Sequence, residues 1–185
     1  TALPLDTLEI LSEFPFTRKC DLVGDNDSQF ALNRTYPSDH YVRFHRTSGT
    51  SGNPLGVCDT SLDWQWWIET WQYVLDAAEM EPEDRALMSF SFGPFIGFWS
   101  AYDAAIARGC LVIPSGGLNT LARLELIRNN RVTTVFCTPS YALHMAEVAL
   151  NNQLDVAALD VRRIIVAGEP GGSIPAIRQR IESAW

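Results

Sequence analysis

Lysine is almost absent from this chain of 185 residues, which has thirteen arginines but only one lysine, Lys19. The common nucleotide loop needs a glycine, four further residues and then Gly-Lys-Ser/Thr. No glycine of this sequence is followed by lysine, so that loop is excluded. The net charge of −8 also lacks the basic footprint of a nucleic-acid surface, so nucleic acid is not an expected partner.

Long apolar runs and paired cysteines are missing too. No run of about eighteen apolar residues occurs, so we expect no membrane span. The first residues, Thr-Ala-Leu-Pro-Leu-Asp, lack the basic and apolar regions of a signal peptide. The four cysteines are scattered, and Cys110 and Cys137 lie in apolar runs typical of small core residues. These features predict a reducing, cytoplasmic location.

Catalytic histidine and metal-ligand patterns are absent as well. His40, His45 and His144 are not at metal-ligand spacing, and no Ser-His-Asp arrangement can be argued from them. Lone histidines are most often structural or surface residues. We therefore expect neither a metal site nor a side-chain nucleophile.

Apolar strands alternate with helical segments from residue 61 onward, in a chain that is 46% hydrophobic. The expected strands are 86–90, 110–113, 133–137 and 163–167. The expected helices are 62–80, 95–107, 120–130, 139–151 and 174–185. Near-continuous apolar strands between helices are typical of a parallel sheet that is buried on both sides. The predicted fold class is therefore α/β, with a mostly parallel sheet and helices on both faces.

The helix expected at 62–80 is rich in tryptophan. Apolar side chains recur along it at steps of three and four residues and form one broad face. They are Trp64, Trp67, Ile68, Trp71, Val74, Leu75 and Ala78. Trp66 and Tyr73 fall outside that face. A packed core is the first explanation for these tryptophans, and an edge of a ligand pocket is the alternative.

Small and polar residues follow three of the expected strands directly, at 91–94, 138–141 and 168–172. In open parallel sheets, ligands bind outside the carboxyl ends of the strands. These three loops are therefore where a binding site is expected.

A different loop, Thr47-Ser48-Gly49-Thr50-Ser51-Gly52-Asn53-Pro54, combines hydroxyl groups with glycines. Glycine lets the backbone approach a ligand closely, and freed backbone N–H groups with hydroxyls suit phosphate oxygens. A phosphate cradle is one interpretation. A surface loop is the other, because clusters of serine, threonine and glycine are common there.

This loop resembles the phosphate-binding loop of the adenylate-forming enzymes, which has Gly-Thr-Thr-Gly-x-Pro at its centre. Other segments, in the same order along the chain, are similar to those of the phenylacetate–coenzyme A ligases. They are Phe14-Pro15-Phe16-Thr17-Arg18-Lys19-Cys20-Asp21-Leu22, Phe92-Gly93-Pro94-Phe95-Ile96-Gly97, Gly109-Cys110-Leu111-Val112-Ile113-Pro114, Thr138-Pro139-Ser140-Tyr141-Ala142-Leu143 and Gly168-Glu169-Pro170 with Arg178 and Ile181-Glu182 after it. The resemblance extends over nearly the whole chain.

The resemblance implies an ATP-dependent acyl- or aryl-CoA ligase that forms an acyl adenylate and then a CoA thioester. Its partners would be a small carboxylic acid, ATP with Mg²⁺, and CoA; a homodimer is left open. The β- and γ-phosphates would be held by Thr47, Ser48, Gly49, Thr50, Ser51 and Gly52. The adenine would lie along Gly168, Glu169 and Pro170. Phe92, Gly93 and Tyr141 are candidates for the acid pocket, with ordinary helix packing as the alternative for Tyr141.

Two departures from the family pattern keep other functions open. Phenylacetate ligases commonly have lysine where Asn53 stands, and the wider superfamily has it where Leu55 stands. A non-catalytic nucleotide-binding module of the same fold is one alternative. An adenylating enzyme with a different acceptor, such as a carrier protein or an amine, is another.

The family's catalytic lysine comes from a mobile C-terminal domain, and Lys19 stands in the wrong segment for that role. We therefore expect no catalytic residue in this chain, and we expect the chain to be the N-terminal portion of a longer protein, inactive alone. Residues 1–46 would lead into the core, and residues 47–185 would form an incomplete α/β nucleotide-binding core.

Overall fold

A computed structural model of the chain describes residues 7–23, 31, 33–47 and 54–185. The chain divides into two compact units, Thr1–Thr60 and Ser61–Trp185, and each is described by itself. The expected extent of the nucleotide-binding core, 47–185, stays a prediction.

The first unit contains an antiparallel hairpin of β1 (Tyr41–Arg46) and β2 (Gly56–Thr60), in which Phe44 pairs with Cys58. Short helices precede it: η1 (Leu8–Glu13), α1 (Lys19–Leu22) and η2 (Ser38–His40). Strand β2 is not apparent from the sequence, because it is short and contains glycine and aspartate, which are depleted in strands.

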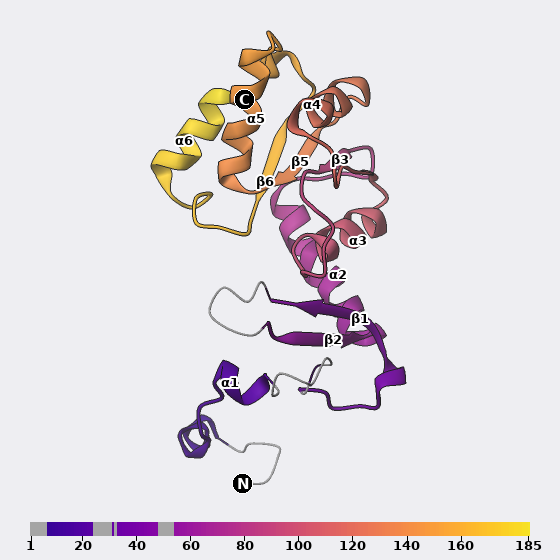
Figure 1. The fold of residues 1–185 in the computed structure, drawn as a ribbon, viewed down its shortest axis with the longest axis vertical. Helices are drawn as coiled ribbons and strands as arrows, with labels where there is room; N and C mark the ends of the chain where they lie inside the picture. Colours follow the sequence, from indigo (N-terminus) through magenta and orange to yellow (C-terminus); the bar gives the residue numbers. More distant parts are fainter. Residues whose placement is uncertain (1–6, 24–30, 32, 48–53) are drawn as a thin grey trace. The chain divides into compact units, whose positions relative to one another are not determined.

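The second unit is an α/β layer structure with a four-stranded, wholly parallel sheet in the order β4-β3-β5-β6 (Figure 1). Its strands are β3 (Arg85–Met88), β4 (Leu111–Pro114), β5 (Thr134–Cys137) and β6 (Arg163–Val166). Its helices are α2 (Ser61–Ala77), α3 (Trp99–Arg108), α4 (Thr120–Asn129), α5 (Pro139–Asn151), η3 (Val156–Ala158) and α6 (Pro175–Ala184). The predicted α/β fold class is confirmed.

Each strand sends alternate side chains into two separate cores. Met88 and Phe136 join the core on the side of α2 and α3, where the buried alanines of α3 allow close packing. Leu87 and Val135 join the core on the side of α4, α5 and α6. Successive residues of a strand point to opposite faces, so strands that are buried on both faces are apolar at nearly every position. The predicted helices on both faces follow from this requirement.

Helix α2 packs on α3 through its tryptophan face. The indole N–H of Trp64 donates to Asp103 at 2.8 Å, and that of Trp71 donates to Ser100 at 2.7 Å. Trp66 and Tyr73 are 59% and 78% exposed, as their position outside the predicted face requires. These bonds give the buried indole of Trp64 and the half-buried indole of Trp71 the hydrogen-bond partners that burial demands. The core explanation for Trp64 and Trp71 is therefore the one that the contacts support.

Helix α3 starts later than the sequence predicts, at Trp99 instead of residue 95. The backbone of Gly97 has a φ of +37°, which is outside the right-handed helical region and delays the start. The helix ends at Gly109, whose φ of +95° is the left-handed cap that glycine favours.

A buried carboxylate fastens the amino edge of the sheet. Asp84 is 2% exposed and accepts hydrogen bonds from Thr133 Oγ1 at 2.7 Å and Glu81 N at 2.8 Å. Arg162 and Arg163 donate to the same carboxylate at 3.0 and 3.2 Å. Burial alone would raise the pKa of Asp84, but these donors together hold the pKa below its ordinary value. The cluster thus joins the starts of β3, β5 and β6.

We expect Asp84→Asn to lower the free energy of unfolding by about 3 kcal/mol, because it leaves buried donors without their charged partner. Equilibrium denaturation of the chain measures this difference. Since the folded pKa is lowered, the stabilisation is fully present above the ordinary value of 3.8 and is lost as the pH falls through the folded pKa. The difference between parent and variant should therefore shrink in acid.

Asp160→Asn is the matched control. Asp160 also pairs with an arginine, Arg131, at 3.2 Å, but both side chains are exposed. Exposed ion pairs add little to stability, so this variant should unfold like the parent. Equal destabilisation by both substitutions would contradict the role assigned to Asp84.

Candidate functional site

All four strands of the parallel sheet end at one edge, and the predicted site loops of the second unit follow them there. Residues 89–98 follow β3, residues 115–119 follow β4, and residues 167–174 follow β6. The central strand β3 has β4 on one side and β5 on the other, which makes its carboxyl end the switch point of the sheet. Ligands of open α/β sheets bind at such switch points.

The segment after β5 begins helix α5 with a regular cap. Thr138 accepts a hydrogen bond from Tyr141 N at 3.3 Å through its hydroxyl oxygen, and Pro139 occupies the first turn. Ser140 N donates to Glu169 Oε1 at 2.6 Å. This last bond joins two segments that the sequence predicts separately, the one after β5 and the one after β6.

Glu169 is held as a carboxylate by the start of α5. Hydrogen bonds from the hydroxyl and the backbone N–H of Ser140 lower the pKa of Glu169, with a smaller contribution from Thr138. The positive end of the helix dipole favours the same charge state. The Glu169 side chain is therefore directed to α5, and it fixes the backbone of residues 168–170 at the edge of the sheet.

Glycines allow the loop after β6 to lie this close to α5. Gly168 has a φ of +92°, a conformation that side chains rarely adopt. A Cβ on Gly171 would lie 2.6 Å from Pro139 Cβ, and a Cβ on Gly172 would lie 2.5 Å from Val166 Cγ2. Both distances are too short for carbon atoms, so glycine is required at Gly171 for the contact with α5 and at Gly172 for the contact with the end of β6.

Phe92 and Gly93, two of the predicted acid-pocket residues, lie on the side of α3. The Phe92 ring packs against Phe90 and Trp99, with centroid distances of 4.8 and 4.6 Å. The indole N–H of Trp99 donates to Gly93 O at 3.0 Å. Gly116, from the loop after β4, passes so close that an added Cβ would lie 2.9 Å from Phe92. This aromatic cluster fixes the loop after β3.

Tyr141, the third predicted acid-pocket residue, packs with the core on the side of α4 and α5. Its hydroxyl lies 3.1 Å from Thr120 Oγ1, and the Arg123 guanidinium lies 5.1 Å from the centre of its ring. Thr120 and Arg123 were not singled out from the sequence. Arg123 could have been noticed in the sequence, because it is a charged residue next to Leu124 within the apolar pattern of α4.

The predicted phosphate loop lies mostly outside the described residues. Ser48, Gly49, Thr50, Ser51 and Gly52 fall in that undescribed stretch, so their role stays a prediction. Thr47 is described: its N–H donates to Leu55 O, and its hydroxyl oxygen accepts from Leu55 N, both at 3.0 Å. These bonds extend the β1–β2 ladder and close the base of the loop.

A buried histidine and aspartate lie beside the same loop base. His45 Nδ1 is 3.4 Å from Asp59 Oδ2, across the hairpin, and both side chains are buried. Neither residue was assigned a function from the sequence beyond a structural one for His45. The pair lies inside the hairpin that carries the loop.

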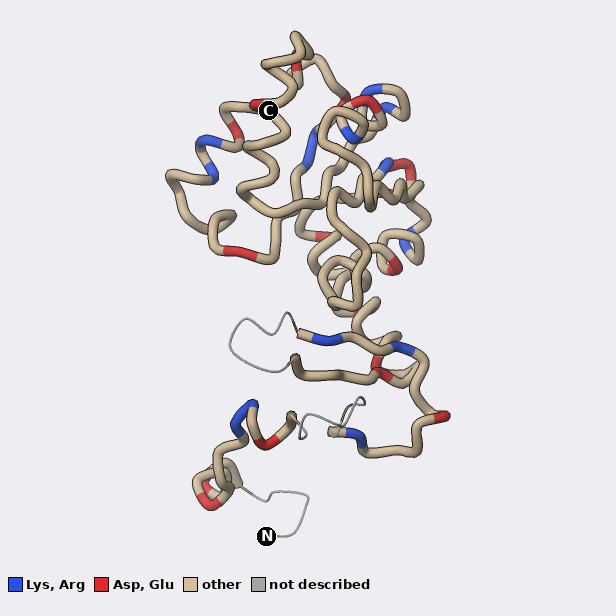
Figure 2. Tube along the Cα trace, in the orientation of Figure 1, with Lys and Arg blue, Asp and Glu red and all other residues tan. Residues whose placement is uncertain are grey.

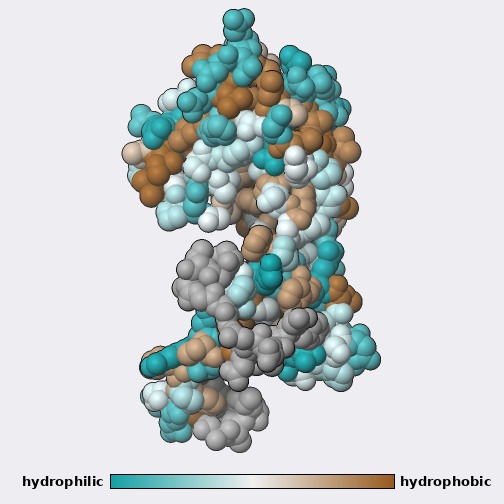
Figure 3. Space-filling model, in the orientation of Figure 1, coloured by the Kyte–Doolittle hydropathy of each residue, from teal (hydrophilic) through white to brown (hydrophobic). Residues whose placement is uncertain are grey.

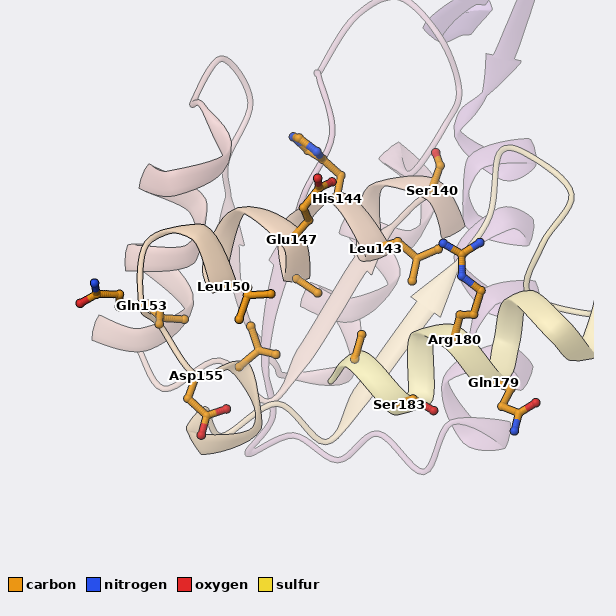
Figure 4. Close-up of a pocket in the computed structure, with 14 residues that line it drawn as sticks. Ser140, Leu143, His144, Glu147, Leu150, Gln153, Asp155, Gln179, Arg180 and Ser183 are labelled. Carbon is orange, nitrogen blue, oxygen red and sulfur yellow. The ribbon is translucent and has the colours of Figure 1, made fainter.

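A cavity of about 1210 Å³ is an open groove between α5 and α6, away from the carboxyl edge of the sheet. Figure 4 shows Ser140 and Arg180 toward one end of it and Gln153 and Asp155 toward the other. The predicted acid and adenine residues are absent from its lining as far as the chain is described. Apolar and polar surface alternate over the face of this unit shown in Figure 3.

Charged groups of both signs are interspersed along residues 61–185 (Figure 2). In the described ranges, no three His, Cys, Asp or Glu side chains gather as a metal-binding group. The helices of the described residues include none that is both long and apolar enough to cross a bilayer.

Comparisons with known proteins agree on one family. Residues 7–178 match the family model described as AMP-binding enzyme. The chain is 34% identical to a phenylacetate-coenzyme A ligase of Pseudomonas putida, over 90% of this chain and 37% of that protein. It is 33% identical to the phenylacetate-coenzyme A ligase of Escherichia coli (strain K12), over 95% of this chain and 39% of that protein. The chain thus spans less than two fifths of the length of these relatives.

A solved structure has the same fold. A 2-hydroxyisobutyryl-CoA ligase in complex with 2-HIB-AMP and CoA superimposes with a TM-score of 0.75 and 26% identity. The match covers 80% of this chain and 32% of that one.

We expect Gly171→Ala to separate the loop after β6 from α5. The added Cβ overlaps Pro139, and overpacking of this kind costs about 1–3 kcal/mol. Amide hydrogen exchange should show faster exchange at Ser140, whose N–H loses Glu169. Ser173→Ala, an exposed position of the same loop, is the control and should leave Ser140 protected. Unchanged protection in Gly171→Ala would contradict the close packing described here.

Proposed function

The chain belongs to the AMP-binding enzyme family, and on this premise we propose that it forms part of an ATP-dependent acyl- or aryl-CoA ligase. In the first step, a carboxylate oxygen of the acid attacks the α-phosphorus of ATP, and the bond to pyrophosphate breaks. In the second step, the sulfur of CoA attacks the acyl carbon, AMP leaves, and the thiol proton is released.

One observation carries this proposal: the Ser140–Glu169 bond at 2.6 Å, which unites two motif segments at the carboxyl edge of the sheet. The family match accounts for those segments together, and the curated relatives are phenylacetate-coenzyme A ligases. The 2-hydroxyisobutyryl-CoA ligase holds an acyl adenylate and CoA on the same fold. Phenylacetate-like or other small carboxylic acids are therefore the proposed substrates.

The proposed chemistry depends on alignment and on charge neutralisation rather than on a nucleophile from this chain. Hydroxyls and backbone N–H groups of residues 47–52 would hold the β- and γ-phosphates, and closure of the loop base by Thr47 and Leu55 supports this role. The backbone of residues 168–170 would lie along the adenine, because Glu169 is directed to α5 and leaves the backbone free for a flat ring.

The acid would lie between Phe92, Gly93 and Tyr141, whose aromatic rings suit an aromatic or apolar acyl group. Mg²⁺ would enter with the phosphates of ATP, where it neutralises charge on the leaving pyrophosphate. The lysine that contacts the acyl phosphate in this family would come from a further domain, since Lys19 is the only lysine here. ATP and CoA are available in the cytoplasm, so we place the activity there.

Acid-dependent exchange of labelled pyrophosphate into ATP tests the proposal on the full-length protein. We expect exchange with at least one acid of a panel of arylacetic, benzoic and short aliphatic acids, because adenylation is reversible. Reactions without acid are the control and should show only background. The absence of exchange with every acid would contradict the ligase assignment. Exchange without thioester formation from CoA would instead indicate another acceptor.

A non-catalytic nucleotide-binding module is the second candidate, and the uncharged residues Asn53 and Leu55 favour it. A charge-assisted contact with phosphate adds about 1–3 kcal/mol, which the present loop lacks. If the loop binds phosphate, Leu55→Lys should strengthen binding of ATP·Mg²⁺ about tenfold or more by calorimetry.

Leu55→Gln controls for side-chain length and should leave the affinity unchanged. Weak binding by the parent, a gain in Leu55→Lys and no exchange activity would together support the module. If the parent bound ATP·Mg²⁺ tightly and Leu55→Lys bound it with the same affinity, the loop would not need a lysine at this position to bind phosphate.

A further inference from the structure

Arg123 is a buried arginine whose described contacts are all with uncharged groups. Its residue is 8% exposed, and its neighbours Leu124 and Ile127 belong to the core between the sheet and α4. Buried charges are normally paired with an opposite charge. Arg163, at the other edge of the sheet, follows this rule through Asp84. Among the residues that the structure describes, Arg123 makes no ion pair, so its burial needs another explanation.

One contact of Arg123 fixes the loop after β4. Its Nε donates to Ser115 O at 3.1 Å. Ser115 is itself buried, and its hydroxyl donates to Met88 O at 2.7 Å, at the carboxyl end of the central strand. Arg123 is therefore connected through Ser115 to the switch point of the sheet.

The other contact of Arg123 is the face of the Tyr141 ring, with the guanidinium carbon 5.1 Å from the ring centre. A planar guanidinium stacks on an aromatic face in a way that an ammonium group cannot reproduce. The hydroxyl at the far end of the Tyr141 side chain lies 3.1 Å from Thr120 Oγ1, within hydrogen-bond distance. The backbone of Tyr141 is held by the Thr138 cap at 3.3 Å. Tyr141 is thus held at its backbone, its ring face and its hydroxyl.

We propose that Arg123 is a positioning residue for the acid site: it holds the Tyr141 ring in place at the carboxyl edge of the sheet as one wall of the pocket for the acyl group. This inference rests on the proposed function and extends it to a residue that contacts no substrate itself. A wall that is already ordered before binding costs the ligand less ordering entropy. Loss of the contact therefore weakens binding of the acid more than binding of ATP.

Steady-state kinetics of Arg123→Lys in the full-length protein test this role. The substitution keeps the charge but loses the planar stack and the Nε–H donor. The expected result is a KM for the acid raised about tenfold, with the KM for ATP within about twofold of the parent. Equal changes in both KM values, or a lowered melting temperature alone, would overturn the proposal.

Arg108→Lys is the matched control. Arg108 is a partly buried arginine on α3 that donates to Gln72, Asp76 and Met80 O, away from the loops after the strands. Its substitution should lower the melting temperature without changing the KM for the acid. The double variant Tyr141→Phe/Arg123→Lys tests whether the hydroxyl contact of Tyr141 and the Arg123 contact act together on the same ring. Tyr141→Phe removes the hydroxyl but keeps the ring. Non-additive effects on the acid KM are expected, and additive effects would overturn the proposal.

A second readout does not depend on activity. In protein labelled with 3-fluorotyrosine, the Tyr141 resonance is assigned by its loss in Tyr141→Phe. It should shift or broaden in Arg123→Lys and stay in place in Arg108→Lys; an unchanged resonance in Arg123→Lys would overturn the proposal. If the unmodified protein showed no acid-dependent exchange, the proposed function would fail, and the fluorine signal would still decide whether Arg123 holds the ring.

Discussion

Parallel pairing of the four strands is the constraint on which the rest of the second unit depends. Parallel neighbours need crossover connections, so helices cover both faces of the sheet and most strand residues after the first are apolar. The same geometry brings the carboxyl ends of all four strands to one edge. The loops after β3, β4, β5 and β6 are therefore neighbours at that edge, although they are far apart along the chain. A binding site can form there without any change in the core.

Buried or hydrogen-bonded polar side chains join separate segments at both edges of the sheet. At the amino edge, Asp84 lies at the start of β3 and accepts hydrogen bonds from the starts of β5 and β6 and from the segment after α2, so a buried cluster joins these segments. At the carboxyl edge, Glu169 and Arg123 each join two loops, and each lies against α5. The two contacts differ in kind. Glu169 accepts a hydrogen bond from a backbone N–H at the start of α5, whereas Arg123 covers the face of the Tyr141 ring.

The choice of arginine over lysine fits this arrangement. Thirteen arginines and one lysine leave the chain few compact, mobile cations and many planar ones. Planar guanidinium groups suit fixed contacts with carbonyl oxygens, carboxylates and rings, as at Arg108, Arg123 and Arg163. In the described part of the chain, these three arginines therefore make fixed contacts that hold neighbouring segments in place.

The order of residues was enough to predict the fold class and most of the buried face of α2, although Val74 of that face is 41% exposed. Apolar runs, helical periodicity, Pro139 and Gly109 act locally, so their effects are visible in the order of residues. Sequence could not show that Ser140 binds Glu169 or that Arg123 covers Tyr141, because these partners are 29 and 18 positions apart and meet only when the strands align. It also missed β2 and the late start of α3, where pairing with β1 and the backbone of Gly97 decide the outcome. Tertiary structure alone decided which side chains face each other at the carboxyl edge, since strand order sets those distances.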